Sequence, residues 1–122
     1  MVRALFDTNI LIDVIENKAE ALVEVQRYDD RAISIVSWIE VMVGAPEVKA
    51  DSTRRFLSHF KVIGLDEEVA EIAAALRRDR RLKLPDAVIW ASARRDSRLL
   101  VTRDAKDFAP GDPGVRVPYR LD

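Results

Sequence analysis

Short β-prone apolar runs alternate with segments of helical periodicity along this chain of 122 residues, and this alternation constrains the fold more than any other feature. The apolar runs are the predicted strands, at residues 2–6, 32–36, 61–65, 98–102 and 115–119. Strands joined by helical crossovers pair in parallel, with helices on both faces of the sheet. We therefore predict an α/β fold, a three-layer α/β/α sandwich with a central, mainly parallel sheet, as a single domain over residues 1–122.

The clearest predicted helix follows Asp66, whose side chain can cap its N-terminus. Apolar residues recur there at the spacing of one buried helix face: Val69, Ile72, Ala73 and Leu76. Periodicity predicts further helices at residues 10–15, 21–28, 39–43, 47–60 and 85–95. Pro118 cannot donate to a sheet ladder, so the last strand is expected at an edge.

The residue types present narrow the possible chemistry. The chain has no Cys and a single His, so thiolate zinc sites, iron–sulfur clusters and disulfides are excluded, and carboxylates are the main candidate metal ligands. No apolar run approaches the roughly 20 residues that cross a bilayer. Acidic residues interrupt the N-terminal apolar stretch, which therefore lacks the core of a signal peptide. We expect a cytoplasmic protein with no membrane partner.

Charge is unevenly distributed along the chain. Residues 1–51 carry ten acidic and five basic residues, whereas residues 52–103 carry seven acidic and twelve basic residues. The densest basic stretch contributes the candidate RNA-binding residues, Arg77, Arg78, Arg80, Arg81 and Lys83. The alternative is a solvated helix end, where basic residues are favoured by the helix dipole.

Acidic residues follow the predicted strands at the edge where ligands bind in parallel sheets. Asp7 ends the first strand, and Glu40 lies one turn into the helix after the second. Asp104 and Asp107 follow the strand at 98–102, and Asp86 begins the helix that leads back to that strand. These carboxylates are therefore expected to converge at one edge of the sheet.

Each carboxylate also has an ordinary structural explanation. Ser37-Trp38-Ile39-Glu40 forms a good capping box, which is the favoured interpretation of Glu40 taken alone. Asp86 can complement a helix N-terminus, and Asp104 can cap a short turn. Convergence favours a metal site instead, because carboxylates at one sheet edge repel each other unless a cation is bound. Oxygen ligands select Mg²⁺ or Mn²⁺, as one or two ions, and such ions catalyse phosphodiester hydrolysis through metal-activated water.

Four stretches of the chain resemble, in order, the four motifs of PIN-domain ribonucleases, and the compact form resembles the toxins of VapBC toxin–antitoxin modules. They are Asp7-Thr8-Asn9-Ile10-Leu11-Ile12, Ser37-Trp38-Ile39-Glu40 with Gly44, Leu84-Pro85-Asp86-Ala87, and residues 100–108. The resemblance implies that the metal-binding and catalytic acids are Asp7, Glu40, Asp86 and Asp104, with Asp107 as an auxiliary metal ligand. It implies supporting polar roles for Thr8, Asn9, Ser37 and Thr102.

The resemblance implies a metal-dependent endoribonuclease, the toxin of a toxin–antitoxin pair, with RNA as substrate, a cognate antitoxin as partner and a homodimeric assembly. The alternatives within the family are a PIN nuclease for RNA processing and one that acts on DNA. A phosphatase of haloacid-dehalogenase type is disfavoured, because Asp7-Thr8-Asn9 lacks a second Asp two residues after the first. A catalytically silent RNA-binding or protein-interaction module remains a further alternative.

Overall fold

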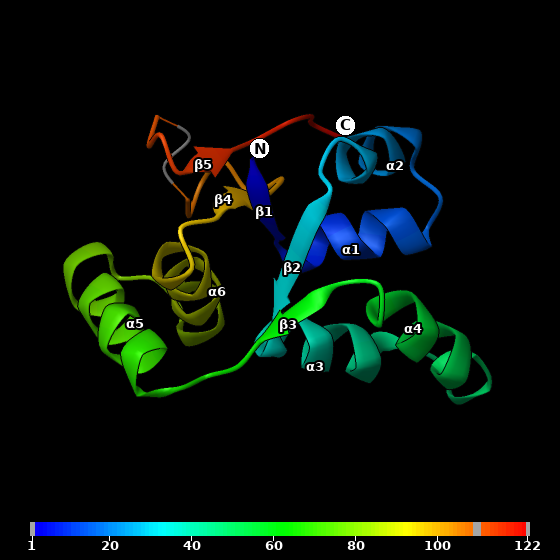
Figure 1. The fold of residues 1–122 in the computed structure, drawn as a ribbon, viewed down its shortest axis with the longest axis horizontal. Coiled ribbons are helices and arrows are strands. Elements are labelled where there is room, and N and C mark those ends of the chain that lie inside the picture. The colour runs from blue at the N-terminus through cyan, green and yellow to red at the C-terminus, as the bar shows by residue number, and fades with distance from the viewer. Residues whose placement is uncertain (1, 109–110, 122) are drawn as a thin grey trace.

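Five parallel strands form one sheet in the computed structural model, which describes residues 2–108 and 111–121 (Figure 1). The strands are β1 (Arg3–Phe6), β2 (Asp30–Ser34), β3 (Lys61–Ile63), β4 (Leu99–Val101) and β5 (Val115–Arg116). Their order across the sheet is β3-β2-β1-β4-β5. The predicted parallel sheet is confirmed, and so is the edge position of the last strand.

Helices cover both faces of this sheet. They are α1 (Thr8–Ile15), α2 (Ala19–Gln26), α3 (Ile35–Gly44), the short 3₁₀ helix η1 (Glu47–Lys49), α4 (Ala50–Leu57), α5 (Glu67–Arg80) and α6 (Leu84–Arg95). Figure 1 shows α5 and α6 on one side of the strands, and α1, α2 and α4 on the other. The predicted three-layer α/β/α arrangement is therefore confirmed. Among the described residues, none of these helices has the length and apolar character needed to cross a membrane.

Two hydrophobic cores lie on opposite faces of the sheet. Leu5 and Leu100 belong to the core shared with α5 and α6. Phe6 and Val101, the next residue of each strand, belong to the core shared with α1, α2 and α4. Successive strand residues point to opposite faces, so a strand covered on both sides must be apolar at every position. This requirement explains the continuous apolar runs in the sequence.

The order of the strands places a crevice beside β1. The chain builds β1, β2 and β3 outward in one direction and then returns to add β4 and β5 on the other side of β1. The direction of winding therefore reverses between β1 and β4, and ligands bind at such switch points, outside the carboxyl ends of the strands. The first residue after β1, Asp7, donates its backbone N–H to the carbonyl oxygen of Val101 in β4, at 2.9 Å.

The start of α3 differs from the sequence prediction. The strand expected at 32–36 ends at Ser34, whose hydroxyl caps α3 by accepting the backbone N–H of Val36 at 3.1 Å. Helix α3 therefore begins at Ile35, and Ser37 is a buried residue inside its first turn. The capping box predicted at Ser37 and Glu40 is wrong, because Ser34 already supplies the cap. The Glu40 carboxylate therefore does not cap α3 and is available for another interaction.

Other boundaries are close to those predicted. Asp66 caps α5 by accepting the backbone N–H of Val69 at 2.9 Å, and Pro85 lies in the first turn of α6, as expected. The helix predicted at 47–60 is divided into η1 and α4 and ends at Leu57. The last strand stops at Arg116, so Pro118 lies beyond it. The Pro- and Gly-rich composition of residues 109–118 predicts a closing loop, of which residues 109 and 110 lie outside the described part of the chain.

Candidate metal centre

Asp7 lies where β1 ends and is the N-cap of α1. Its Oδ1 accepts the backbone N–H of Thr8 at 2.7 Å, and its Oδ2 accepts the hydroxyl of Thr102, just after β4, at 2.7 Å. Both carboxylate oxygens are therefore held, one by the first residue of α1 and the other by the residue that follows β4. The residue is only 5% exposed, so its orientation is fixed by packing as well as by hydrogen bonds.

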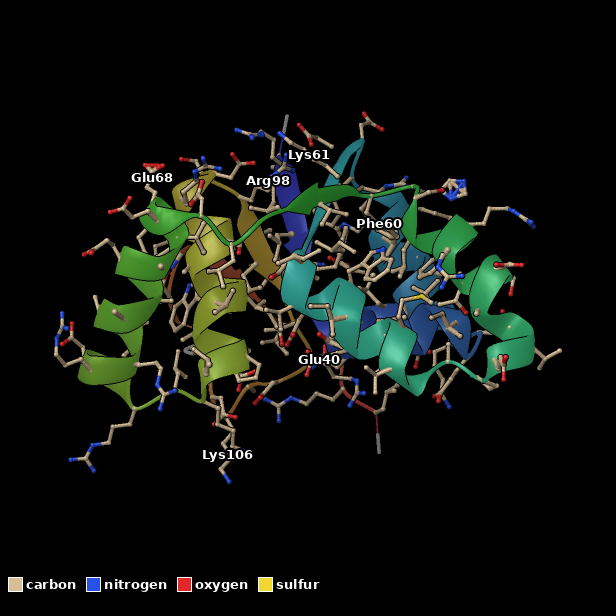
Figure 2. All side chains as sticks on the ribbon, turned by 90° about the horizontal axis from the view of Figure 1, so that it is seen from below. Glu40, Phe60, Lys61, Glu68, Arg98 and Lys106 are labelled. Carbon is tan, nitrogen blue, oxygen red and sulfur yellow. The ribbon has the colours of Figure 1, made fainter. Side chains whose placement is uncertain are left out.

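Glu40 is directed toward the same crevice by Thr8. The Thr8 hydroxyl donates to Oε1 of Glu40 at 2.8 Å and lies 2.9 Å from the hydroxyl of Ser37. A hydroxyl has one proton, so Ser37 donates to Thr8 while Thr8 donates to Glu40. Figure 2 shows Glu40 on the same edge of the molecule as Lys106, which follows β4, and opposite the edge that carries Lys61 and Arg98.

Asp86, Asp104 and Asp107 form the tightest group of carboxylates among the described residues. Each can offer an oxygen that lies within 4.8 Å of an oxygen from each of the other two. Asp86 comes from the first turn of α6, whereas the other two come from the turn after β4. Residues far apart in the sequence are therefore brought to one point by the parallel sheet.

The turn after β4 is organised by Asp104. Its Oδ1 accepts the backbone N–H groups of Lys106 at 2.9 Å and Asp107 at 3.0 Å. Its own backbone N–H donates to the hydroxyl of Thr102 at 3.0 Å. The predicted capping role of Asp104 is confirmed, and it engages Oδ1 only. Asp104 can therefore stabilise the turn with one oxygen and offer the other to a ligand.

Burial and mutual repulsion shift the acidity of these groups. Burial raises the pKa of the Asp7 carboxyl to about 6, an effect that hydrogen bonds from Thr102 and Thr8 partly offset and the charges of Asp86 and Asp104 reinforce. The pKa of Asp86 is also raised, first by burial and then by the negative charges of Asp107, Asp104 and Glu40. Electrostatics therefore couples all five carboxylates, although only three form the tightest group.

The donor set fits a hard divalent cation. In octahedral coordination at about 2.1 Å, ligand oxygens lie roughly 3 to 4 Å apart, so carboxylates within 4.8 Å of one another need little movement to share an ion. The absence of Cys from the chain leaves oxygen donors, which favour Mg²⁺ or Mn²⁺ over softer metals. A bound cation would also relieve the repulsion that raises the pKa of Asp86.

Some of the predicted site residues belong to this carboxylate group, and others do not. Asp86, Asp104 and Asp107 constitute it, whereas Asp7 and Glu40 are not members of it. The predicted supporting residues make specific contacts. Thr102 holds Asp7. Thr8, which is itself hydrogen-bonded to Ser37, holds Glu40. Asn9 accepts the backbone N–H of Arg103 at 3.2 Å. The roles assigned to all these residues stay predictions.

Sequence reasoning missed the ion pair that holds the start of the same turn. Asp13, 2% exposed on α1, accepts Nε of Arg103 at 2.7 Å, and the hydroxyl of Tyr119 donates to it at 2.8 Å. A buried acid needs partners, so an Asp within the apolar run of α1 was the available signal. This pair anchors the residue before Asp104 to α1.

The basic stretch covers the last turn of α5 and the residues before α6, and part of it makes contacts within the protein. The guanidinium carbon of Arg80 lies 4.7 Å from the centroid of the Trp90 ring, and a terminal nitrogen lies 4.0 Å from Asp112. Arg77, Arg78, Arg81 and Lys83 are exposed. The charge of Lys83 partly offsets the rise in the pKa of Asp86, so this base lies near the carboxylate group. RNA binding by the stretch stays a prediction.

A doubly wound parallel sheet with carboxylates gathered at its switch point defines an α/β protein with a candidate metal centre. The sequence model of the PIN domain matches residues 4–109, and the chain belongs to the PIN-domain family, a family of nucleases. A search of curated protein sequences found no match. Family membership confirms the predicted fold.

Solved structures share the fold over nearly the whole chain. A toxin–antitoxin complex from Klebsiella pneumoniae contains a chain with 46% identity and a TM-score of 0.91, over 97% of this chain and 99% of that one. DNA-bound VapBC from Salmonella typhimurium matches at 25% identity and a TM-score of 0.79, over 95% and 96%. FitAcB from Neisseria gonorrhoeae matches in fold, at 22% identity and a TM-score of 0.81, over 97% and 99%. The predicted likeness to VapC-type toxins is confirmed.

Proposed function

We propose that this protein is an Mg²⁺- or Mn²⁺-dependent endoribonuclease and the toxin of a toxin–antitoxin pair, acting on RNA in the cytoplasm. The observation that carries the proposal is the convergence of Asp86, Asp104 and Asp107 beside the buried Asp7 at the switch point of the sheet. Two of these groups have raised pKa values, a frequent property of functional sites. Family membership and the toxin–antitoxin relative of 46% identity support the same function.

The residues of the chain divide the work of holding one or two ions. Asp86, Asp104 and Asp107 would provide ligands, and Glu40 and Asp7 would complete the negative pocket. A bound ion supplies Lewis-acid chemistry, by which a phosphoryl oxygen is polarised and water becomes a stronger acid. Thr102 and Thr8 fix the orientations of Asp7 and Glu40, so that the pocket needs little rearrangement when substrate arrives.

The proposed reaction predicts the chemistry of the RNA ends. Attack by water on phosphorus leaves a 5′-phosphate and a 3′-hydroxyl, so sequencing of RNA ends after brief induction in cells should reveal new 5′-phosphate ends at defined positions. The Asp7→Asn variant, induced to the same level, should produce none. Cyclic 2′,3′-phosphate ends would contradict hydrolysis by water, and cleavage of DNA but not RNA by the purified protein would assign a different substrate.

Bases beside Asp86 are expected to contact the RNA backbone. Arg81 and Lys83 are exposed at the junction of α5 and α6, where they can reach phosphates next to the carboxylates. Replacing both by Ala should lower the magnitude of the salt slope by roughly one unit, since each single-strand phosphate contact contributes about 0.7. The measurement is the affinity of the Asp86→Asn background for an RNA oligonucleotide at several salt concentrations.

The matched control for this measurement is Arg54→Ala combined with Arg55→Ala in the same background. These two exposed bases lie on α4, on the other side of the sheet from α5 and α6 (Figure 1). The control should retain the salt slope of its parent. If the Arg81 and Lys83 variant also retains it, the stretch is an ordinary solvated surface.

A cognate antitoxin is the proposed protein partner. A groove of about 220 Å³ lies between α1 and the end of α3 and is lined by Ile12, Ile15, Val41 and Pro46, with Glu40 at one side. Ile12 and Ile15 are 40% and 43% exposed, so the groove presents apolar side chains at the surface. The relative of 46% identity was solved as a toxin–antitoxin complex, which supports an antitoxin segment as the occupant. The homodimer implied by the resemblance stays part of the proposal.

A further inference from the structure

We propose that Trp90 and Phe108 are positioning residues for the metal centre, because their contact sets the spacing between Asp86 and the turn that carries Asp104 and Asp107. The inference rests on the proposed function and deepens it. It explains how helix α6 and the turn after β4 hold three mutually repelling carboxylates close together.

The two aromatic residues sit beside the carboxylates in the chain. Trp90 is one helical turn after Asp86 on α6, and Phe108 directly follows Asp107. Their ring centroids lie 5.6 Å apart with an interplanar angle of 78°, an edge-to-face contact. Both side chains are at most 1% exposed. The contact therefore joins, within the core, the two elements that supply the carboxylate group.

The turn after β4 is held at both ends, and Phe108 is the second anchor. At its start, Thr102 binds Asp7, and Arg103 pairs with the buried Asp13. At its end, Phe108 enters the core that α5 and α6 share with the sheet. Between these anchors, Asp107 is exposed, and its backbone N–H is held only within the turn itself, by Oδ1 of Asp104. The position of the Phe108 ring against Trp90 therefore determines where this part of the turn lies relative to α6.

Two arginines from different helices lie over the Trp90 ring. The guanidinium carbons of Arg80, at the end of α5, and Arg94, on α6, lie 4.7 and 4.8 Å from its centroid. Each of these arginines also has a terminal nitrogen within 4.0 Å of Oδ2 of Asp112, in the segment before β5. Cation–π contacts of this kind favour one ring orientation. The surface that receives Phe108 is consequently a fixed one.

Mn²⁺ affinity separates positioning from simple core packing. We expect Trp90→Leu and Phe108→Leu each to weaken Mn²⁺ binding about 10-fold in calorimetric titration, the size of effect that partners of metal ligands commonly have. Trp90→Phe, which keeps an aromatic edge, should restore most of the affinity. Because the two rings act as one unit, the double Leu variant should lose no more affinity than either single variant.

The matched control is Phe60→Leu. Phe60 makes edge-to-face contacts of its own, with Phe56 at 5.4 Å and Phe6 at 5.9 Å, in the core on the opposite face of the sheet. This variant should lower the melting temperature as much as the other Leu variants do, yet bind Mn²⁺ within about 2-fold of wild type. Circular dichroism and the melting temperature establish that each variant is folded when its affinity is measured.

Three outcomes would overturn the inference, and they are distinguishable. If wild type binds Mn²⁺, Asp86→Asn does not, and Trp90→Leu and Phe108→Leu bind like wild type, the rings only pack the core and the proposed function is unaffected. If Phe60→Leu weakens Mn²⁺ binding as much as Trp90→Leu does, the loss reflects general destabilisation. A wild-type protein that binds no Mn²⁺ would overturn the metal centre together with the positioning role.

Discussion

Replacing Asp86 by Asn is expected to lower RNA cleavage by about 100-fold or more and to abolish growth inhibition on induction, while the protein remains folded. Even the partners of metal ligands contribute 10- to 100-fold, so loss of a ligand charge should do at least as much. The amide keeps the shape of the carboxylate but binds hard cations weakly. Asp86 belongs to the carboxylate group and lies in the first turn of α6. Its carboxylate accepts no hydrogen bond from the described residues, so a neutral side chain there disturbs none.

Asp79→Asn is the matched control, because Asp79 is an exposed acid on the neighbouring helix α5 and lies outside the carboxylate group. Cleavage rates of the purified proteins with Mg²⁺ and with Mn²⁺ are compared at equal concentration. The control should cleave as wild type does. Wild-type cleavage by Asp86→Asn would remove this residue from the metal centre and leave it with a helix-terminus role alone.

The second large effect is a pH-dependent cost in stability caused by Asp7. Burial raises the pKa of this carboxyl from 3.8 to about 6 in the folded protein, so the folded state binds the proton more tightly than the unfolded state does. Stability from this group is therefore fully present below pH 3.8 and is lost as pH rises to about 6. At 1.36 kcal/mol per pKa unit, the loss amounts to about 3 kcal/mol at neutral pH.

Comparison of wild type with Asp7→Asn isolates this effect, because other titrating groups are common to both proteins. In the presence of a chelator, the unfolding free energy of Asp7→Asn relative to wild type should rise by roughly 2 to 3 kcal/mol between about pH 4 and pH 7. Urea unfolding at fixed ionic strength measures it. A difference that does not change with pH would show that Asp7 titrates normally in the folded protein.

Mn²⁺ should restore the folding stability that wild type loses at neutral pH. A ligand that binds only the folded state at 100 times its dissociation constant stabilises by about 3 kcal/mol. Without metal, Asp86→Asn should melt above wild type, since one of the charges that repel Asp7 is removed, and it should gain less from Mn²⁺. If Asp86→Asn melts below wild type and Mn²⁺ stabilises neither protein, the carboxylates are dispersed caps rather than a metal centre.

The fold could be predicted from the sequence because parallel strands covered on both faces must be apolar at every position. The runs that became β1 and β4 carry this signature, and the capped periodic helix after Asp66 was equally explicit. The boundary between β2 and α3 could not be predicted from the sequence. Ile35 and Val36 are β-branched and extend the apolar run, yet they are helical because the hydroxyl of Ser34 caps them. A local hydrogen bond outweighed propensity there.

For the site, the sequence alone determined which residue types could serve as metal ligands. Chain order and the rules of parallel sheets also place Asp7, Asp86 and Asp104 at one edge of the sheet. Tertiary structure alone decided the distances. It gathered Asp86, Asp104 and Asp107 most tightly, left Glu40 to be held by Thr8, and buried Asp7 deeply enough to raise its pKa to about 6. The reason is physical. Spacing along the chain carries no information about burial or about contacts between distant segments, and both the repulsion and the hydrogen bonds of the site arise from these.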